Sequence, residues 1–184
     1  MIKDIVLDLD ETLIHGVPLG DPNLTSRIQE LKRVLNYKIM EDQSYIIFER
    51  PYVRSFLNYA CSIANVSVWT AASQTYGNFI VRMLFDEPYR QCKAFFHRDH
   101  CMSSEKATGY LKSLEWLSSV GAVNAYPHHT EMILVDDRSD IALANPHTAI
   151  VIDAFVGNPS DVALRNLAEY LKTIVHSNVL METD

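Results

Sequence analysis

The sequence has few cysteines, no long apolar run and fewer basic than acidic residues. Its 184 residues include three cysteines, Cys61, Cys92 and Cys101, without CxxC spacing, so we expect free thiols in a reducing compartment. No apolar run approaches the ~20 residues of a membrane span, and Asp4 interrupts the place of a signal peptide's apolar segment. We therefore expect a soluble, intracellular protein, in the nucleus or the cytoplasm, without membrane association.

The charge balance and length limit the function classes. The chain has 16 Lys and Arg against 23 Asp and Glu, a net charge of −7, whereas binding to nucleic acid needs a basic face. We do not expect nucleic acid as a direct partner. Nearly half of the residues are apolar, with 6 Gly and 7 Pro, as in ordinary globular chains. We predict a single domain over residues 1–184 and a monomer.

Strand-like runs alternate with segments of helical periodicity. The strand-like runs are Ile2–Leu9, Tyr45–Phe48, Val66–Thr70, Ala94–Phe96, Met132–Val135 and Ala149–Ile152. Apolar residues at helical spacing follow Val53, Phe79 and Leu111, and again between Val162 and Ile174. This alternation predicts an α/β fold, a parallel sheet with helices on both faces.

One segment interrupts the alternation. Tyr37–Met40 and Ser44–Phe48 flank the polar triplet Glu41–Gln43, which predicts a small β-hairpin insertion over about residues 36–49. Pro51 follows, and we predict that it occupies the first position of the next helix. No segment is long enough for a large cap domain.

Acidic residues stand where the predicted strands end. Asp8 follows the apolar run Ile5–Leu7, Asp10 comes two residues later, and Asp136 and Asp137 follow MILV. In parallel sheets, ligands bind beyond the carboxyl ends of the strands. A buried carboxylate is costly unless it is paired or holds a metal. These acids are therefore either solvated at a strand end or functional.

If they are functional, phosphoryl transfer fits the pattern. Asp8 can attack phosphorus, and Asp10, on the same side of an extended chain, can act as general acid and base. The repulsion between a phosphate and paired carboxylates calls for Mg²⁺, with Asp136 and Asp137 as further ligands. Lys112 can neutralise the phosphoryl group.

Three further assignments have alternatives. Thr70 and the Ala71 backbone can bind the phosphoryl group, although Thr70 also suits a helix N-cap. Lys112 has a rival in Lys106. Arg98 can contact substrate, or form an ion pair with its neighbour Asp99. Zinc is not expected, because the spacing of the candidate ligands matches no closed site; these are His97, His100, Cys101, His128 and His129.

The motifs resemble a known family. DLDET at 8–12 resembles the DxDx(T/V) signature of haloacid-dehalogenase-type (HAD-like) phosphatases, and WTAAS, the lysine of GYLKSLEWL and VDDRS resemble the next three motifs in order. More closely, DLDETLIH, ERPYVRSFL, the hairpin and HRDHC are similar to the phosphatases of the RNA polymerase II C-terminal domain. The resemblance covers residues 3–175.

The resemblance implies a HAD-like, Rossmann-like fold and a Mg²⁺-dependent phosphoprotein phosphatase. Its substrate would be phosphoserine or phosphothreonine in a protein, the polymerase tail included. Asp8 would be the nucleophile and a metal ligand. Asp10 would be the general acid and base, with its backbone carbonyl on the metal. Asp136 and Asp137 would complete the metal site, directly or through water.

The resemblance also implies roles for the remaining motif residues in binding the substrate and in supporting the loop. Thr70, Ala71 and Lys112 would bind the phosphoryl group, Thr12 would brace the loop, and Arg98 would contact the substrate peptide.

Some positions depart from the family pattern. Ser73 stands where the small family members commonly have an apolar residue, and Asp137 where they often have asparagine. Two alternatives therefore remain: a phosphatase of a small phosphorylated metabolite or nucleotide, and a non-catalytic binding protein on the same fold. Binding proteins of this kind typically lose motif residues, which are all present here.

Overall fold

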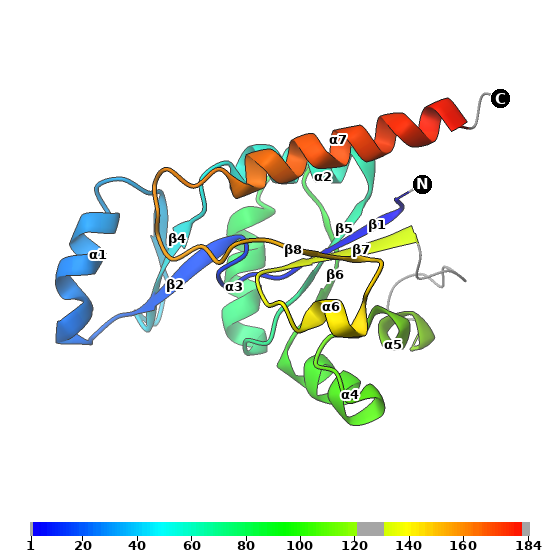
Figure 1. The fold of residues 1–184 in the computed structure, drawn as a ribbon. Helices are drawn as coiled ribbons and strands as arrows, with labels where there is room; N and C mark the ends of the chain where they lie inside the picture. Colours follow the sequence, from blue (N-terminus) through cyan, green and yellow to red (C-terminus); the bar gives the residue numbers. More distant parts are fainter. Residues whose placement is uncertain (1, 121–130, 182–184) are drawn as a thin grey trace.

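The core of the protein is a five-stranded parallel sheet in the order β6-β5-β1-β7-β8 (Figure 1). The structure, a computed structural model, describes residues 2–120 and 131–181. The strands are β1 (Asp4–Leu7), β5 (Asn65–Trp69), β6 (Cys92–Phe96), β7 (Met132–Asp136) and β8 (Ala149–Val151). The predicted parallel α/β fold is confirmed, and its central strand is β1.

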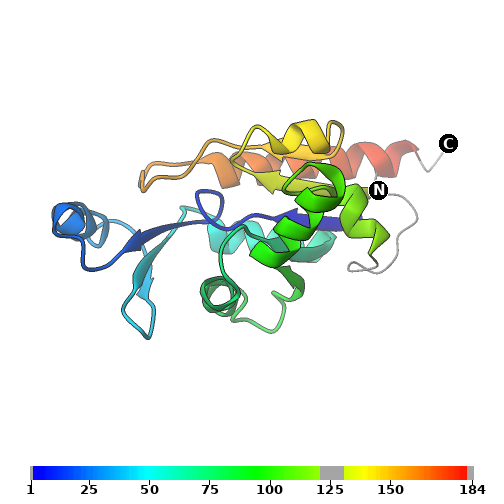
Figure 2. The same ribbon diagram turned by 90° about the horizontal axis from the view of Figure 1, so that it is seen from below.

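Helices cover both faces of this sheet (Figures 1 and 2). Alternating β1 side chains divide the core, because Ile5 and Leu7 belong to one apolar cluster and Val6 to another. The first cluster includes α2 (Val53–Ile63), α3 (Gln74–Leu84) and α7 (Ala163–Met181). The second includes α4 (Arg98–Thr108), α5 (Leu114–Ser119) and α6 (Ile141–Ala144). Among the described residues, no helix is long and apolar enough to cross a membrane.

A three-stranded antiparallel sheet is attached to the core, in the order β2-β4-β3. It consists of β2 (Ile14–Pro18), β3 (Tyr37–Ile39) and β4 (Tyr45–Glu49), with a short 3-10 helix (Pro22–Leu24) and α1 (Thr25–Leu31) between β2 and β3. The predicted hairpin is therefore present as β3 and β4. The strand β2 was not predicted, because it is short and contains a glycine and a histidine.

Three local predictions were wrong. The first strand was predicted to reach Leu9 but ends at Leu7. Beyond it the chain turns, and the backbone N–H groups of Leu13 and Ile14 both donate to the Leu9 carbonyl. Pro51 is not the first residue of α2: Tyr52 has φ 67° and separates Pro51 from the helix. The helix predicted from Leu111 begins only at Leu114. The helix α4 was not predicted either, because its sequence is largely polar.

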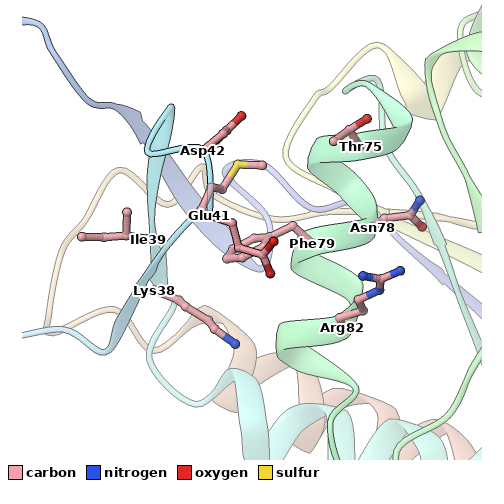
Figure 3. Close-up of a pocket in the computed structure, with 9 residues that line it drawn as sticks. Lys38, Ile39, Glu41, Asp42, Thr75, Asn78, Phe79 and Arg82 are labelled. Carbon is pink, nitrogen blue, oxygen red and sulfur yellow. The ribbon is translucent and has the colours of Figure 1, made fainter.

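A pocket of about 420 Å³ separates the β3–β4 hairpin from α3. Lys38 lines it from the hairpin and extends toward α3, whereas Arg82 lines it from α3 and lies along that helix near Asn78 (Figure 3). Phe79 lies between them, with its ring centroid 5.8 Å from the Lys38 Nζ. Glu41 and Asp42, at the hairpin turn, add acidic groups. The pocket therefore combines charged groups of both signs with the apolar side chains of Ile39, Met40 and Phe79.

Candidate active site

Three carboxylates meet at the carboxyl edge of the sheet. Asp8 follows β1, Asp136 ends β7 and Asp137 comes next, so parallel pairing of β1 with β7 places the three acids together. One oxygen of each lies within 4.8 Å of the others. The side chains of Asp8 and Asp136 are only 8% and 0% exposed. β1 ends at Leu7, and Asp8 just beyond it is buried, so the alternative of a solvated acid is wrong for Asp8.

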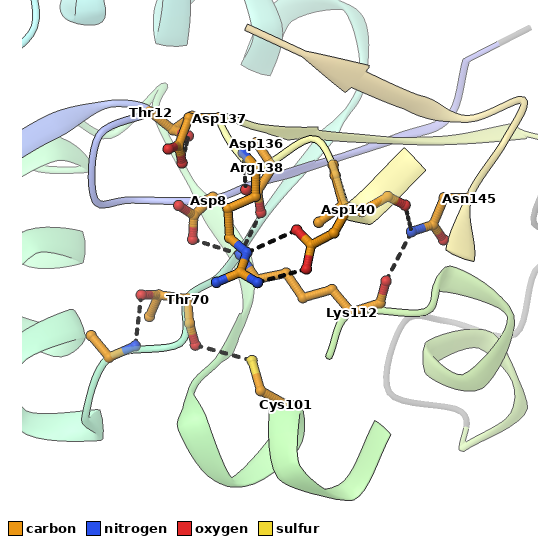
Figure 4. Close-up of polar contacts among 12 residues, drawn as sticks. Asp8, Thr12, Thr70, Cys101, Lys112, Asp136, Asp137, Arg138, Asp140 and Asn145 are labelled. Carbon is orange, nitrogen blue, oxygen red and sulfur yellow. Dashed lines mark hydrogen bonds and ion pairs between the residues drawn. The ribbon is translucent and has the colours of Figure 1, made fainter. Parts of the chain in front are cut away.

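Lys112 lies between two of these acids (Figure 4). Its Nζ is 2.6 Å from Asp8 Oδ1 and 2.7 Å from Asp136 Oδ2. The Asn145 side chain donates to the Lys112 carbonyl at 2.8 Å and so fixes the bend before α5. Burial alone would lower the pKa of Lys112, but the two carboxylates raise it above its ordinary value. Lys106, in contrast, is exposed on α4.

The acids outnumber the single ammonium group. Burial raises the pKa of Asp8 to about 7; the charge on Lys112 opposes this rise and that on Asp136 adds to it. Burial and Asp136 also raise the pKa of Asp137. The group therefore favours a further cation, and carboxylate oxygens at these mutual distances suit Mg²⁺. The donor set fits the predicted cofactor.

The Asp10 carboxylate is held apart from this acidic group. Its Oδ1 accepts a hydrogen bond of 2.5 Å from the Tyr76 hydroxyl on α3. Burial raises the pKa of Asp10, whereas the bond from Tyr76 lowers it. Its side chain does not belong to the metal-ligand group found among the described residues. This agrees with a role for Asp10 in which only its backbone carbonyl faces a metal.

Thr70 directly follows β5 and is buried at the same edge of the sheet as the acids. Its Oγ1 accepts the backbone N–H of Ala72 at 3.0 Å, while the N-cap of α3 is Ser73. The N-cap alternative for Thr70 is therefore wrong. Thr12, which was expected to brace the loop, donates to Asp137 Oδ1 at 3.5 Å.

Arg98 lies at the rim of the site. It is exposed, and its Nε donates to the Ala71 carbonyl at 3.2 Å. Asp99 lies 3.8 Å from His97 instead of pairing with Arg98. Of the other residues considered for zinc, Cys101 donates to the Thr70 carbonyl, whereas His128 and His129 lie outside the described residues.

Comparison with known proteins identifies the family. The model of the NLI interacting factor-like phosphatases matches residues 3–180. A CTD phosphatase-like protein, 355R, of Invertebrate iridescent virus 6 is 34% identical over 145 residues, 76% of this chain and 79% of the relative. The chain belongs to the NLI interacting factor-like phosphatase family. The predicted relationship to the HAD-like CTD phosphatases is confirmed, and with it the enzyme class.

Further relatives of this phosphatase support the assignment. The 355R protein of Invertebrate iridescent virus 3 is 29% identical over 93% of this chain and 96% of the relative. The solved structure of Fcp1, an RNA polymerase II CTD phosphatase, superimposes with a TM-score of 0.59 at 17% identity. That match covers 94% of this chain and 48% of the Fcp1 chain, so the phosphatase spans about half of that length. This likeness confirms the fold.

One buried arginine of the phosphatase was not predicted from the sequence. Arg50 is fully buried, and its Nη1 donates to the Thr12 carbonyl at 3.0 Å. Its Nε and Nη2 also pair with Asp161 at 2.9 and 2.8 Å. Arg50 thus ties the loop after Asp8 to the segment before α7. Arg50 belongs to the motif ERPYVRSFL, but the motif alone did not indicate a structural role for it.

Proposed function

We propose that the protein is a Mg²⁺-dependent phosphatase of phosphoserine or phosphothreonine in proteins, acting through a phosphorylated Asp8. The observation that carries this proposal is the burial of Asp8 against Lys112, with Asp136 and Asp137 within ligand distance, in a chain of a phosphatase family. A carboxylate that is paired with a lysine and lies at the carboxyl edge of a sheet is suited to attack a bound phosphoryl group.

In the first step, an oxygen of Asp8 attacks phosphorus and the bond from phosphorus to the ester oxygen breaks. Asp10 donates its proton to the leaving oxygen. The Lys112 ammonium, 2.6 Å from Asp8 Oδ1, offsets the charge of the transferring group. Thr70 and the Ala71 backbone bind the phosphoryl oxygens.

In the second step, Asp10 takes a proton from water, and the water oxygen bonds to phosphorus. The bond from phosphorus to Asp8 breaks, which releases phosphate and restores the carboxylate. Asp10 regains in this step the proton that it lost in the first, so one carboxyl serves both steps.

The metal would be held by Asp8, Asp136, Asp137 and the Asp10 backbone carbonyl. When bound, Mg²⁺ neutralises carboxylates and stabilises negative charge on the phosphoryl group. We expect Mg²⁺ to raise the midpoint of thermal unfolding of the wild type by roughly 5 °C, because it binds only the folded arrangement.

The Mg²⁺ effect can be assigned to the site by two variants. Asp137→Asn should reduce the shift, whereas Asp140→Asn, which removes an exposed acid paired with Arg138, should leave it unchanged. Differential scanning fluorimetry with and without Mg²⁺ measures both. An equal shift in all three proteins would place the ion elsewhere.

A protein substrate is supported by the pocket beside α3. The viral relative is named as a CTD phosphatase-like protein and Fcp1 as an RNA polymerase II CTD phosphatase. We propose a phosphorylated protein segment, that domain included, as substrate. Lys38 and Arg82 line the pocket, and among the described residues neither has an ion-pair partner. Such cations would attract acidic side chains that flank the phosphorylated residue.

We therefore expect Arg82→Glu to raise KM about 10-fold for a phosphopeptide with acidic flanks, and to leave hydrolysis of a small aryl phosphate unchanged. Arg33→Glu, a charge reversal at an exposed position that does not line the pocket, serves as the matched control. Steady-state kinetics of the three proteins on both substrates measure the difference. Efficient turnover of sugar or nucleotide phosphates, with no effect of Arg82→Glu on the peptide, would favour the metabolite alternative.

A further inference from the structure

Tyr76 is the one described side chain that forms a hydrogen bond with the Asp10 carboxylate. The hydroxyl lies 2.5 Å from Asp10 Oδ1, and both side chains are partly buried. Tyr76 belongs to none of the phosphatase motifs named above, and it lies six residues after Thr70 on the first turn of α3. A phenol hydroxyl that donates to the general acid has a direct path to influence proton transfer.

Three elements fix the position of this hydroxyl. The Ser73 Oγ accepts the backbone N–H of Tyr76 at 3.4 Å and so sets the start of α3. The Tyr76 ring packs edge-on against Tyr45 of β4, with centroids 5.2 Å apart. A Cβ at Gly16 in β2 would lie 2.0 Å from the Tyr76 hydroxyl oxygen. The hydroxyl therefore reaches Asp10 only because residue 16 has no side chain.

We propose that Tyr76, in the place left free by Gly16, is a positioning residue that orients the Asp10 carboxyl for proton transfer. This inference rests on the function proposed above. The bond from Tyr76 occupies Oδ1, so the transferable proton of Asp10 resides on Oδ2. Oδ2 gives that proton to the leaving oxygen in the first step and takes one from water in the second. Tyr76 keeps its own proton throughout.

The leaving group provides the test. A serine alkoxide is a poor leaving group and needs the proton from Asp10, whereas nitrophenolate leaves with little help. The ratio kcat/KM reports the steps up to the first irreversible one, here formation of phospho-Asp8. We expect Tyr76→Phe to lower kcat/KM about 10-fold for a phosphoserine peptide, through kcat, and less than about 2-fold for p-nitrophenyl phosphate.

Two variants make the test independent of Tyr76→Phe. Gly16→Ala keeps the hydroxyl but displaces it, so it should show the same selective loss for the peptide. Tyr45→Phe removes a hydroxyl from the same aromatic pair without touching Asp10, and it should leave both substrates unaffected. In a protein that already carries Asp10→Ala, Tyr76→Phe should cause no further loss, because there is no carboxyl to orient. Thermal unfolding of each variant verifies that it is folded.

Equal losses of kcat/KM for the two substrates would overturn the inference, as would a full further loss in the Asp10→Ala protein. A rise in KM for the peptide with kcat unchanged would make Tyr76 a substrate contact and would also overturn it. In each of these cases the wild type still hydrolyses both esters and the proposed function stands. A folded wild type with Mg²⁺ that hydrolyses neither ester would instead overturn the proposed function.

Discussion

Replacing Asp8 by asparagine is expected to abolish hydrolysis, lowering kcat by about four orders of magnitude or more for both phosphopeptide and aryl phosphate. The amide has nearly the same shape as the carboxylate, but it is too weak a nucleophile to attack phosphorus. Lys112 keeps its second partner, Asp136, at 2.7 Å, so we expect the variant to remain folded. Initial rates with Mg²⁺, together with circular dichroism, provide the measurement.

The matched control lies on the same strand. Asp4 is buried at the opposite end of β1, 3% exposed and away from the acidic group. Asp4→Asn should retain wild-type kcat, because the carboxyl edge of the sheet is unchanged. A folded Asp8→Asn protein that retains more than roughly a hundredth of wild-type kcat would show that Asp8 is not the nucleophile.

The second large effect concerns stability as well as activity. Lys112 is completely buried between Asp8 and Asp136. Lys112→Met removes the cation and leaves two buried carboxylates uncompensated, which costs about 3–5 kcal/mol of unfolding free energy. The same change removes the charge opposite the transferring phosphoryl group, so we expect no measurable hydrolysis. Urea denaturation without divalent cations measures the first effect.

The pH dependence of this variant follows from the same charges. Burial already raises the pKa of Asp8 to about 7, although Lys112 opposes the rise. Without Lys112 that pKa lies higher still, so the folded variant binds more protons than the unfolded chain between the ordinary carboxyl pKa and the raised one. Stability is therefore lost as the pH rises through this window and regained as it falls.

Lys106→Met is the control for both effects, because Lys106 is exposed on α4 and should change stability by no more than about 0.5 kcal/mol. If Lys112→Met were as stable as Lys106→Met at neutral pH, the ion pairs of Lys112 would not be what compensates the buried acids.

The part of the site that follows strand ends could be predicted from the sequence. Asp8, Thr70 and Asp136 each come at the end of an apolar, β-branched run, and parallel strands bring such ends to one edge. Lys112 could be placed only through its motif, since its burial depends on a bend before α5 held by Asn145. Only the structure shows that Lys112 is buried against Asp8 and Asp136, whereas Lys106 is exposed.

Contacts between distant elements could not be predicted. In the sequence, Tyr76 is an ordinary residue of an amphipathic helix. Its hydrogen bond to Asp10 joins residues 66 positions apart, which periodicity cannot indicate. From the sequence alone, Arg50 would be expected at the surface, whereas in the structure it bonds to Thr12 and Asp161. The strand β2 was missed because its pairing with β4 is non-local and its own sequence is short. Such features depend on tertiary packing rather than on periodicity.

The most direct test of a phosphorylated Asp8 is to trap it. The protein is mixed with Mg²⁺ and a radiolabelled phosphoserine peptide, quenched in acid within the first turnover, and digested for mapping. We predict that label is retained on the fragment that contains Asp8 and is released by hydroxylamine, as expected of an acyl phosphate. Turnover of the peptide without labelled protein, or with label on another residue, would contradict the mechanism.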